Sequence, residues 1–187
     1  AATAAVLALE SDVELQALPF ATLRERLLKD GQVLDLPVNV QKKVLISKAS
    51  LQGLVLDDTD ARLTGLWTHS SSAVGYVGTD YIHDGHTEKG EKTVRWILKA
   101  PSSGHFDLRF SYSANPNRAT NVPVRITYRG ETKTVTVNQQ QTPEIDNLFQ
   151  PVGVLELKAD ETVEVLISNE GTNGHVIADA VQLAPML

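Results

Sequence analysis

Clustered aspartates are the first residues in this chain whose spacing could serve chemistry. Asp57, Asp58 and Asp60 occur together in the sequence DDTD, and hard cations such as Ca²⁺ are bound by grouped carboxylates. The sequence that follows lacks the glycine and the distal glutamate of an EF-hand loop. Aspartates at a strand end also accept hydrogen bonds from backbone N–H groups in turns. A cation site and turn chemistry both stay open, and turn chemistry is the expected role.

Two further groups of residues could bind a metal ion or supply a nucleophile. His83 and His86 flank Asp84, and Zn²⁺ takes histidine and carboxylate ligands, but no third ligand of that kind lies near in sequence. Residues 70–72 are three serines that follow His69, without the G-x-S-x-G turn that exposes a nucleophilic serine. We therefore expect loop histidines and a flexible serine loop, with no catalytic residue and no bound metal.

Two tyrosines and one polar loop are better suited to sugar recognition than the groups above are to metal binding or catalysis. Tyr76 and Tyr81 lie in a stretch rich in glycine and serine, and the loop ANPNRATN at residues 114–121 supplies Asn117 and Arg118. Sugars stack on aromatic rings, while a guanidinium can make a forked contact to a pair of oxygens. Loops of a sandwich can converge at one end of the fold. These four residues are the predicted ligand-binding set, although the loop asparagines could equally satisfy their own backbone.

Other prominent side chains are expected to be structural. Trp96 alternates with Arg95 and Ile97, which is typical of a strand with one face in the core. Trp67 is also predicted to be buried, because large apolar rings usually are. Asp179 lies in an otherwise apolar segment, so we expect it to be buried with hydrogen-bond partners.

The elements that must position these residues are mainly strands. Residues 106–112, 122–138 and 162–167 alternate apolar and polar side chains, and Gly130 within the second run indicates a hairpin. Residues 1–30 instead have an alanine-rich start and helical spacing, and they predict two short helices. The fold class is therefore mainly β, an antiparallel β-sandwich or jelly roll with two short N-terminal helices.

The composition of the chain excludes several classes of function. The chain has 187 residues, a net charge of −6 and no cysteine, so disulfides and thiolate chemistry are excluded. There is no basic stripe for nucleic acid and no apolar run of the roughly 20 residues that span a membrane. We expect residues 1–50 to be a helical remnant of an upstream domain plus a connector, and residues 51–187 to be the sandwich.

Three stretches carry a family resemblance. LVLDDTDARLTGLWTHSSSAVGYVGTDYIHDG contains a D-D-x-D segment, then G-x-W-x-x-S, then Gly-Tyr and Asp-Tyr pairs. VRWILKAPSSGHFDLRFSYSANPNRATNVPV and the closing GHVIADAVQLAP continue the match. Residues 52–185 thus resemble the golvesin and xanthan-lyase type of carbohydrate-binding-like domain. The resemblance implies a non-catalytic β-sandwich module whose partner is a polysaccharide or other glycan.

The N-terminal segment carries a second resemblance. AATAAVLALE, followed by VELQALPFATLRERLLKDGQVL, is similar to the end of the catalytic region in bacterial FAD-dependent oxidoreductases. The Gly-rich dinucleotide fingerprint is absent, so we expect FAD in the parent protein and no cofactor in this chain.

These resemblances imply the C-terminal module of a larger bacterial protein that is secreted or periplasmic. Its partners would be a glycan and the upstream flavin domain, with no nucleic acid and no membrane. The alternative is a structural docking domain that packs on the parent enzyme or mediates oligomerisation without binding sugar.

Overall fold

The computed structural model describes residues 2–32, 34 and 45–186, and the chain divides into two compact units, Ala1–Lys43 and Val44–Leu187. The first unit contains helix α1 (Ala2–Glu10), a 3₁₀ turn η1 (Leu15–Ala17) and helix α2 (Phe20–Lys29). Pro19 precedes α2, and Gly31 ends it with a φ of 74°, a conformation that costs glycine nothing. The prediction of two short N-terminal helices is confirmed.

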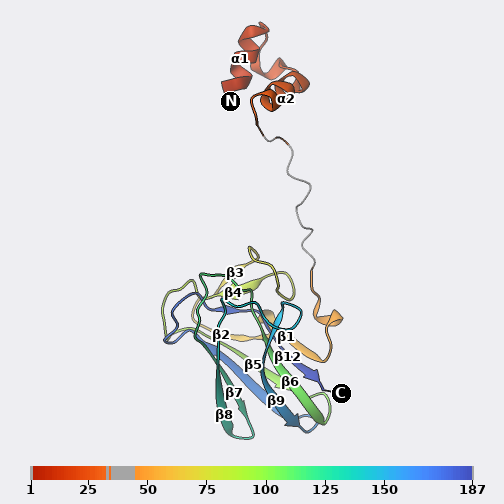
Figure 1. Cartoon of the computed structure of the whole chain (residues 1–187), viewed down its shortest axis with the longest axis vertical. Coiled ribbons are helices and arrows are strands. Elements are labelled where there is room, and N and C mark those ends of the chain that lie inside the picture. The colour runs from red at the N-terminus through yellow and green to blue at the C-terminus, as the bar shows by residue number, and fades with distance from the viewer. Residues whose placement is uncertain (1, 33, 35–44, 187) are drawn as a thin grey trace. The chain divides into compact units, whose positions relative to one another are not determined.

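The second unit is a β-sandwich whose layers are visible in Figure 1. Its first sheet has the order β1-β12-β6-β9, and every pairing in it is antiparallel. These strands are β1 (Leu54–Asp57), β12 (Ala180–Pro185), β6 (Gly104–Ser111) and β9 (Phe149–Leu157). Because β1 pairs with β12, the start and the end of the sandwich lie side by side.

The opposing sheet has the order β2-β5-β10-β7-β8 and is also antiparallel. Its strands are β2 (Arg62–Thr64), β5 (Thr93–Lys99), β10 (Thr162–Ser168), β7 (Val122–Tyr128) and β8 (Glu131–Val137). A small third sheet, β11-β4-β3, comprises Ile177–Ala178, Tyr81–His83 and Thr68–Ser70. It lies at one end of the sandwich in Figure 1. The predicted mainly β sandwich is confirmed.

The core lies between the two large sheets and follows the alternation of the sequence. In β5, Val94, Trp96 and Leu98 are completely buried, because side chains of a strand point to opposite faces in turn. The Trp96 Nε1–H donates to the carbonyl oxygen of Asp57 at 2.8 Å, which ties β5 to the end of β1. Trp67 is also buried, and its Nε1–H donates to the Thr64 carbonyl oxygen. The core positions expected for both tryptophans are confirmed.

The hairpin predicted over residues 122–138 is present as β7 and β8. Tyr128 pairs with Glu131, so the loop consists of Arg129 and Gly130, with φ values of 53° and 78°. Two central residues with positive φ match the twist of the flanking strands. Strand β9, in contrast, was not anticipated, because Pro151 and Gly153 interrupt its pattern.

Short 3₁₀ turns complete the second unit and carry the clustered aspartates. Turn η2 spans Lys48–Ser50, and turn η3 spans Asp58–Asp60 directly after β1. Asp57 caps η3 by accepting a hydrogen bond from the Asp58 N–H at 3.0 Å, while the Asp60 carboxylate accepts one from the Asp57 N–H at 2.8 Å. This reciprocal pair is a capping box, so two of the three aspartates have the turn role expected of them.

Candidate functional site

Tyr81 and Arg118, two of the predicted ligand-binding residues, are in contact. Tyr81 begins β4 and pairs with Ser70 of β3. An Arg118 guanidinium nitrogen donates to the Tyr81 hydroxyl at 3.3 Å, and the guanidinium carbon lies 5.9 Å from the ring centroid. The Ser72 hydroxyl lies 3.2 Å from the same phenol oxygen. The serine loop, β4 and the loop of residues 114–121 therefore meet at one end of the sandwich.

Both predicted tyrosines are buried, which differs from the exposed stacking surface expected from the sequence. Tyr76 and Tyr81 are 6% and 1% exposed, and their ring centroids are 5.6 Å apart. The loop before β4 folds inward because the Val77 N–H donates to the buried carboxylate of Asp179 at 3.0 Å. The Ser111 hydroxyl donates to that carboxylate as well. Asp179 thus has the hydrogen-bond partners predicted for it, and its contacts draw both rings into the core.

Arg118 is largely buried, yet it has spare hydrogen-bonding capacity. Its side chain donates to the Ser113 carbonyl oxygen at 3.4 Å, to Asn117 Oδ1 at 2.9 Å and to Tyr81. A guanidinium has five N–H donors, and these contacts use three of them among the described residues. Asn117 itself is exposed, and its amide supplies further donors.

The loop asparagines mostly serve the backbone, as the alternative interpretation held. Asn115 Oδ1 accepts from the Asn117 N–H at 3.3 Å, and Asn121 Oδ1 accepts from the Asn173 N–H at 3.0 Å. Such local bonds stabilise a tight loop. Arg118 contacts Tyr81, and Asn117 Oδ1 accepts a hydrogen bond from Arg118, so the site depends on those two loop residues.

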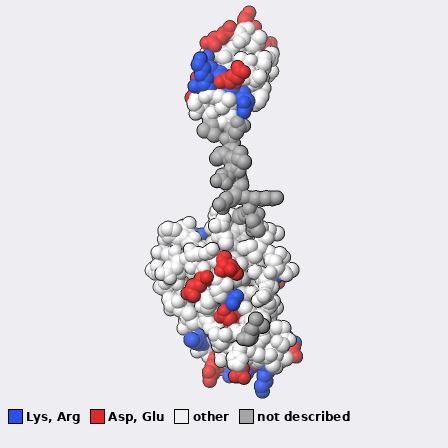
Figure 2. All heavy atoms as spheres, turned by 45° about the vertical axis from the view of Figure 1, so that its right-hand side comes forward, with Lys and Arg blue, Asp and Glu red and all other residues white. Residues whose placement is uncertain are grey.

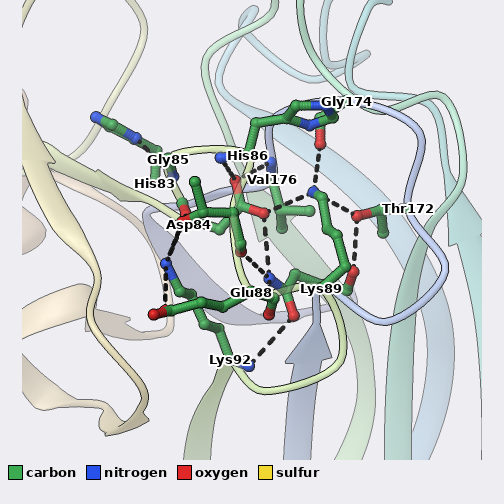
Figure 3. A network of polar contacts seen from close by, with 12 residues as sticks. His83, Asp84, Gly85, His86, Glu88, Lys89, Lys92, Thr172, Gly174 and Val176 are labelled. Atoms are coloured by element: carbon green, nitrogen blue, oxygen red, sulfur yellow. Dashed lines mark hydrogen bonds and ion pairs between the residues drawn. The ribbon is translucent and has the colours of Figure 1, made fainter.

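A buried polar network fixes the neighbouring segment against this loop. The His175 N–H donates to the Asn117 carbonyl oxygen at 3.1 Å, and the Ala119 N–H donates to the His175 carbonyl oxygen at 2.8 Å. The next residue, Val176, donates its N–H to Asp84 Oδ1 at 2.9 Å. Figure 3 shows Asp84 at the centre of a network that includes Val176, His86 and Lys89. Asp84 therefore holds the segment of residues 175–176, which is hydrogen-bonded to Asn117 and Ala119 of the loop.

Asp84 is fully buried and well satisfied. Lys89 Nζ donates to Asp84 Oδ2 at 2.7 Å, and it also donates to Thr172 Oγ1 and the Gly174 carbonyl oxygen. Burial by itself would raise the pKa of Asp84, but the hydrogen bonds from Lys89, Val176 and His86 outweigh it and leave the pKa lowered. The carboxylate is therefore a charged structural anchor.

The histidines beside Asp84 are not arranged around its carboxylate. His83 Nδ1 accepts a hydrogen bond from the Gly85 N–H at 3.1 Å, which is a loop contact. A third histidine, His175, lies near both rings, with centroid distances of 5.9 Å to His83 and 5.4 Å to His86. Desolvation by burial lowers the pKa of both His83 and His175. Sequence spacing missed His175, because it comes from a distant loop.

The remaining aspartate of the DDTD segment behaves differently from its neighbours. Burial, followed by the charges of Asp57 and Asp80, raises the pKa of Asp58 to about 7. Asp60, by contrast, has its own burial outweighed by Lys48, which donates to it at 2.6 Å, and its pKa is lowered.

Charged side chains of both signs are scattered over the sandwich face that Figure 2 shows, without a continuous basic surface on that face. Among the described residues, no helix is long and apolar enough to cross a membrane.

Comparison with known proteins gives the chain a family. Xanthan lyase from Bacillus sp. (strain GL1) is 27% identical over 138 residues, which are 71% of this chain and 14% of the lyase. The solved structure of a Paenibacillus xanthan lyase has 36% identity and a TM-score of 0.65 over 71% of this chain and 13% of the lyase. The chain thus spans only a small part of these lyases.

A more distant structure shares the fold. The GH26-CBM35 β-(1,4)-mannanase of Podospora anserina is 23% identical, with a TM-score of 0.51 over 72% of this chain and 28% of the mannanase. Residues 54–185 match the model of the golvesin C-terminal domain, which covers most of the sandwich. The chain therefore belongs to the golvesin C-terminal domain family.

Proposed function

We propose that residues 51–187 form a non-catalytic carbohydrate-binding module that holds polysaccharide for a larger protein. The observation that carries this proposal is the meeting of Tyr81, Asn117 and Arg118 at one end of the sandwich. The exposed Asn117 amide and the guanidinium of Arg118, which the Tyr81 hydroxyl holds in place, provide donors and acceptors that sugar hydroxyls need. Similarity to part of the xanthan lyases supports the same class of ligand.

The buried tyrosine rings determine what kind of binding we expect. Tyr76 and Tyr81 are too buried to contact a sugar directly, so the ligand would contact the polar edge formed by Asn117 and Arg118, with the Tyr81 hydroxyl positioning Arg118 from behind. A shallow polar edge buries little apolar surface. The affinity should therefore be modest, at roughly millimolar to micromolar Kd, or about −4 to −8 kcal/mol.

Calorimetry against acidic and neutral polysaccharides, xanthan and mannan among them, tests the proposal. Tyr81→Phe removes one hydroxyl, Arg118→Lys removes the fork of N–H donors, and Asn117→Ala removes an exposed amide. Each change should weaken binding roughly threefold to tenfold, because one hydrogen bond contributes about 0.5–1.5 kcal/mol. Chelation with EDTA should leave binding unchanged, because this proposed edge contacts the sugar through protein side chains and not through a metal ion.

The matched control is Ser102→Ala. Ser102 is exposed in the turn between β5 and β6, at the end of β6 opposite the loop of residues 114–121. The Ser102→Ala variant should bind sugar as the unaltered chain does. If no glycan binds, or if the triple variant of Tyr81, Asn117 and Arg118 binds fully, the proposed sugar site is refuted and the docking-domain alternative becomes the favoured one.

We also propose that the parent is an FAD-dependent oxidoreductase that acts outside the cytoplasm. The support is the resemblance of the sequence of residues 1–34 to the end of such a catalytic region. The module would then tether the flavin enzyme to a glycan. Absorption spectroscopy of the full-length parent protein tests this, and a full-length preparation without a flavin band would refute it.

A further inference from the structure

Asp58 is a buried carboxylate without a hydrogen bond. Its side chain is 1% exposed, and neither Oδ1 nor Oδ2 has a hydrogen-bond partner among the described residues. Asp84 and Asp179, the other deeply buried aspartates, both accept several hydrogen bonds. A buried charge left without such bonds is costly unless it is paired or coordinates a metal. An ionised Asp58 therefore needs a cationic partner, because no hydrogen-bond donor among the described residues contacts its carboxylate.

Two potential metal ligands face this carboxylate. His69 Nδ1 lies 4.0 Å from Asp58 Oδ2 and 3.4 Å from Asp80 Oδ1. The three ligand atoms all lie within 4.8 Å of one another. The pairing of β3 with β4 brings His69 and Asp80 together, because His69 lies opposite Ile82 and Asp80 immediately precedes β4, whereas Asp58 comes from turn η3. Asp58 is the buried member of this group.

The group is open on its outer side. The side chains of His69 and Asp80 are 57% and 31% exposed, in contrast to the buried Asp58. An ion could therefore enter from solvent, past two ligands that can move, and reach one that is fixed. Asp57 and Asp60 are occupied by the capping of η3 and do not compete for it.

We propose that Asp58, His69 and Asp80 bind a divalent transition-metal ion, with Zn²⁺ as the best match. Zn²⁺ binds histidine nitrogen and carboxylate oxygen at about 2.0–2.2 Å in a tetrahedron, which places ligand atoms roughly 3.4 Å apart. The distances of 3.4 Å and 4.0 Å are close to that spacing, so small side-chain movements complete the site. The histidine ligand favours Zn²⁺ over Ca²⁺ and Mg²⁺, which prefer oxygen alone.

Three protein ligands leave a fourth position for water or another oxygen ligand. The Zn²⁺ site shares none of its ligands with the proposed sugar edge, although His69 is next to Ser70 and Asp80 is next to Tyr81 in sequence. The two proposals are therefore independent, and one can fail while the other holds.

Calorimetric titration of the purified chain with ZnCl₂, and separately with CaCl₂, tests the site. The unaltered chain should bind one Zn²⁺ more tightly than Ca²⁺ by at least tenfold, and Zn²⁺ should raise its melting temperature, because an ion that binds only the folded state stabilises it. Asp58→Asn and His69→Ala should each weaken Zn²⁺ binding at least tenfold. Melting without metal establishes that both variants are folded.

Two histidine controls locate the ion. His105→Ala removes an exposed histidine on β6, and His86→Ala removes one of the three histidines near Asp84. Both variants should keep Zn²⁺ binding. The proposal is wrong if Zn²⁺ does not bind, if Ca²⁺ binds as tightly, if His69→Ala binds normally, or if His86→Ala abolishes binding. In those cases His69 only contacts the two carboxylates.

Discussion

Replacing Asp84 with asparagine tests whether the network of Figure 3 holds the candidate sugar site together. Asp84 Oδ1 accepts from the N–H groups of Val176 and His86, each at 2.9 Å, while Oδ2 accepts from Lys89 Nζ at 2.7 Å. In Asp84→Asn one oxygen can still serve the two backbone donors. The new NH₂ group, however, faces the ammonium of Lys89, so a largely buried charge loses its anionic partner.

The size of the effect follows from these contacts. Removing one partner of a buried ion pair costs about 3–5 kcal/mol. Lys89 is 25% exposed and keeps two oxygen acceptors, Thr172 Oγ1 and the Gly174 carbonyl, so the lower end applies. We expect Asp84→Asn to lower the free energy of unfolding by about 3 kcal/mol, which is a large part of the 5–15 kcal/mol typical of a domain.

Urea unfolding followed by tryptophan fluorescence measures this loss, and the slope of free energy against urea should stay unchanged. Asp160→Asn is the matched control, because Asp160 pairs with Lys99 at 2.8 Å with side chains 78% and 65% exposed. An exposed pair contributes about 0–1 kcal/mol. An Asp84→Asn variant within about 1 kcal/mol of the unaltered chain would refute the reasoning.

The pH dependence provides a second readout of the same substitution. The folded-state pKa of Asp84 is lowered below its ordinary value by the hydrogen bonds from Lys89, Val176 and His86, so its contribution to stability is present above the unfolded pKa and is lost as pH falls through the folded pKa. The stability difference between the unaltered chain and Asp84→Asn should therefore be constant near neutrality and shrink below about pH 4. A difference that grows in acid would show that the sign is wrong.

Three further outcomes are expected. Gly130→Ala should lower the free energy of unfolding by about 1 kcal/mol, because the φ of 78° strains a Cβ even though nothing lies within 4 Å of it; an unchanged melting temperature would contradict this. Trp96→Phe should cost about 2–3 kcal/mol in urea unfolding, since it leaves the Asp57 carbonyl without its 2.8 Å donor and leaves space in the core; a loss below about 1 kcal/mol would show that the bond contributes little. The purified chain should show no flavin absorption band, because it lacks the Gly-rich phosphate loop.

The parts of the fold that the sequence predicted are those with local causes. Residues 122–138 form the predicted hairpin because alternation and the Arg129-Gly130 turn act on neighbouring residues. Strand β9 was missed because Pro151 and Gly153 are poor strand formers. It is accommodated beside β6 by a shift of register between Leu108 and Arg109, since irregular strand positions tolerate proline.

The exposure of the tyrosines was not predictable from their own segment. Glycine and serine around Tyr76 and Tyr81 indicate a loop, and they do not indicate which side of the loop faces inward. That side is set by Asp179, about a hundred residues later, whose carboxylate binds the Val77 N–H. The contact of Arg118 with Tyr81 likewise depends on two loops that only the tertiary fold brings together.

The aspartates show why closeness in sequence predicts turns better than it predicts sites. Asp57 and Asp60 are near Asp58 in the chain, and nearness lets them cap η3 instead of sharing a cation with it. The side chains that do face Asp58 are His69 and Asp80, which come from strand β3 and from the segment before β4. His175 reaches His83 and His86 in the same way, from a separate loop. Residues close in sequence share one turn and bond to its backbone, whereas converging side chains must come from different elements. A site in this domain is therefore found by working out which strands pair before asking which ligands are near.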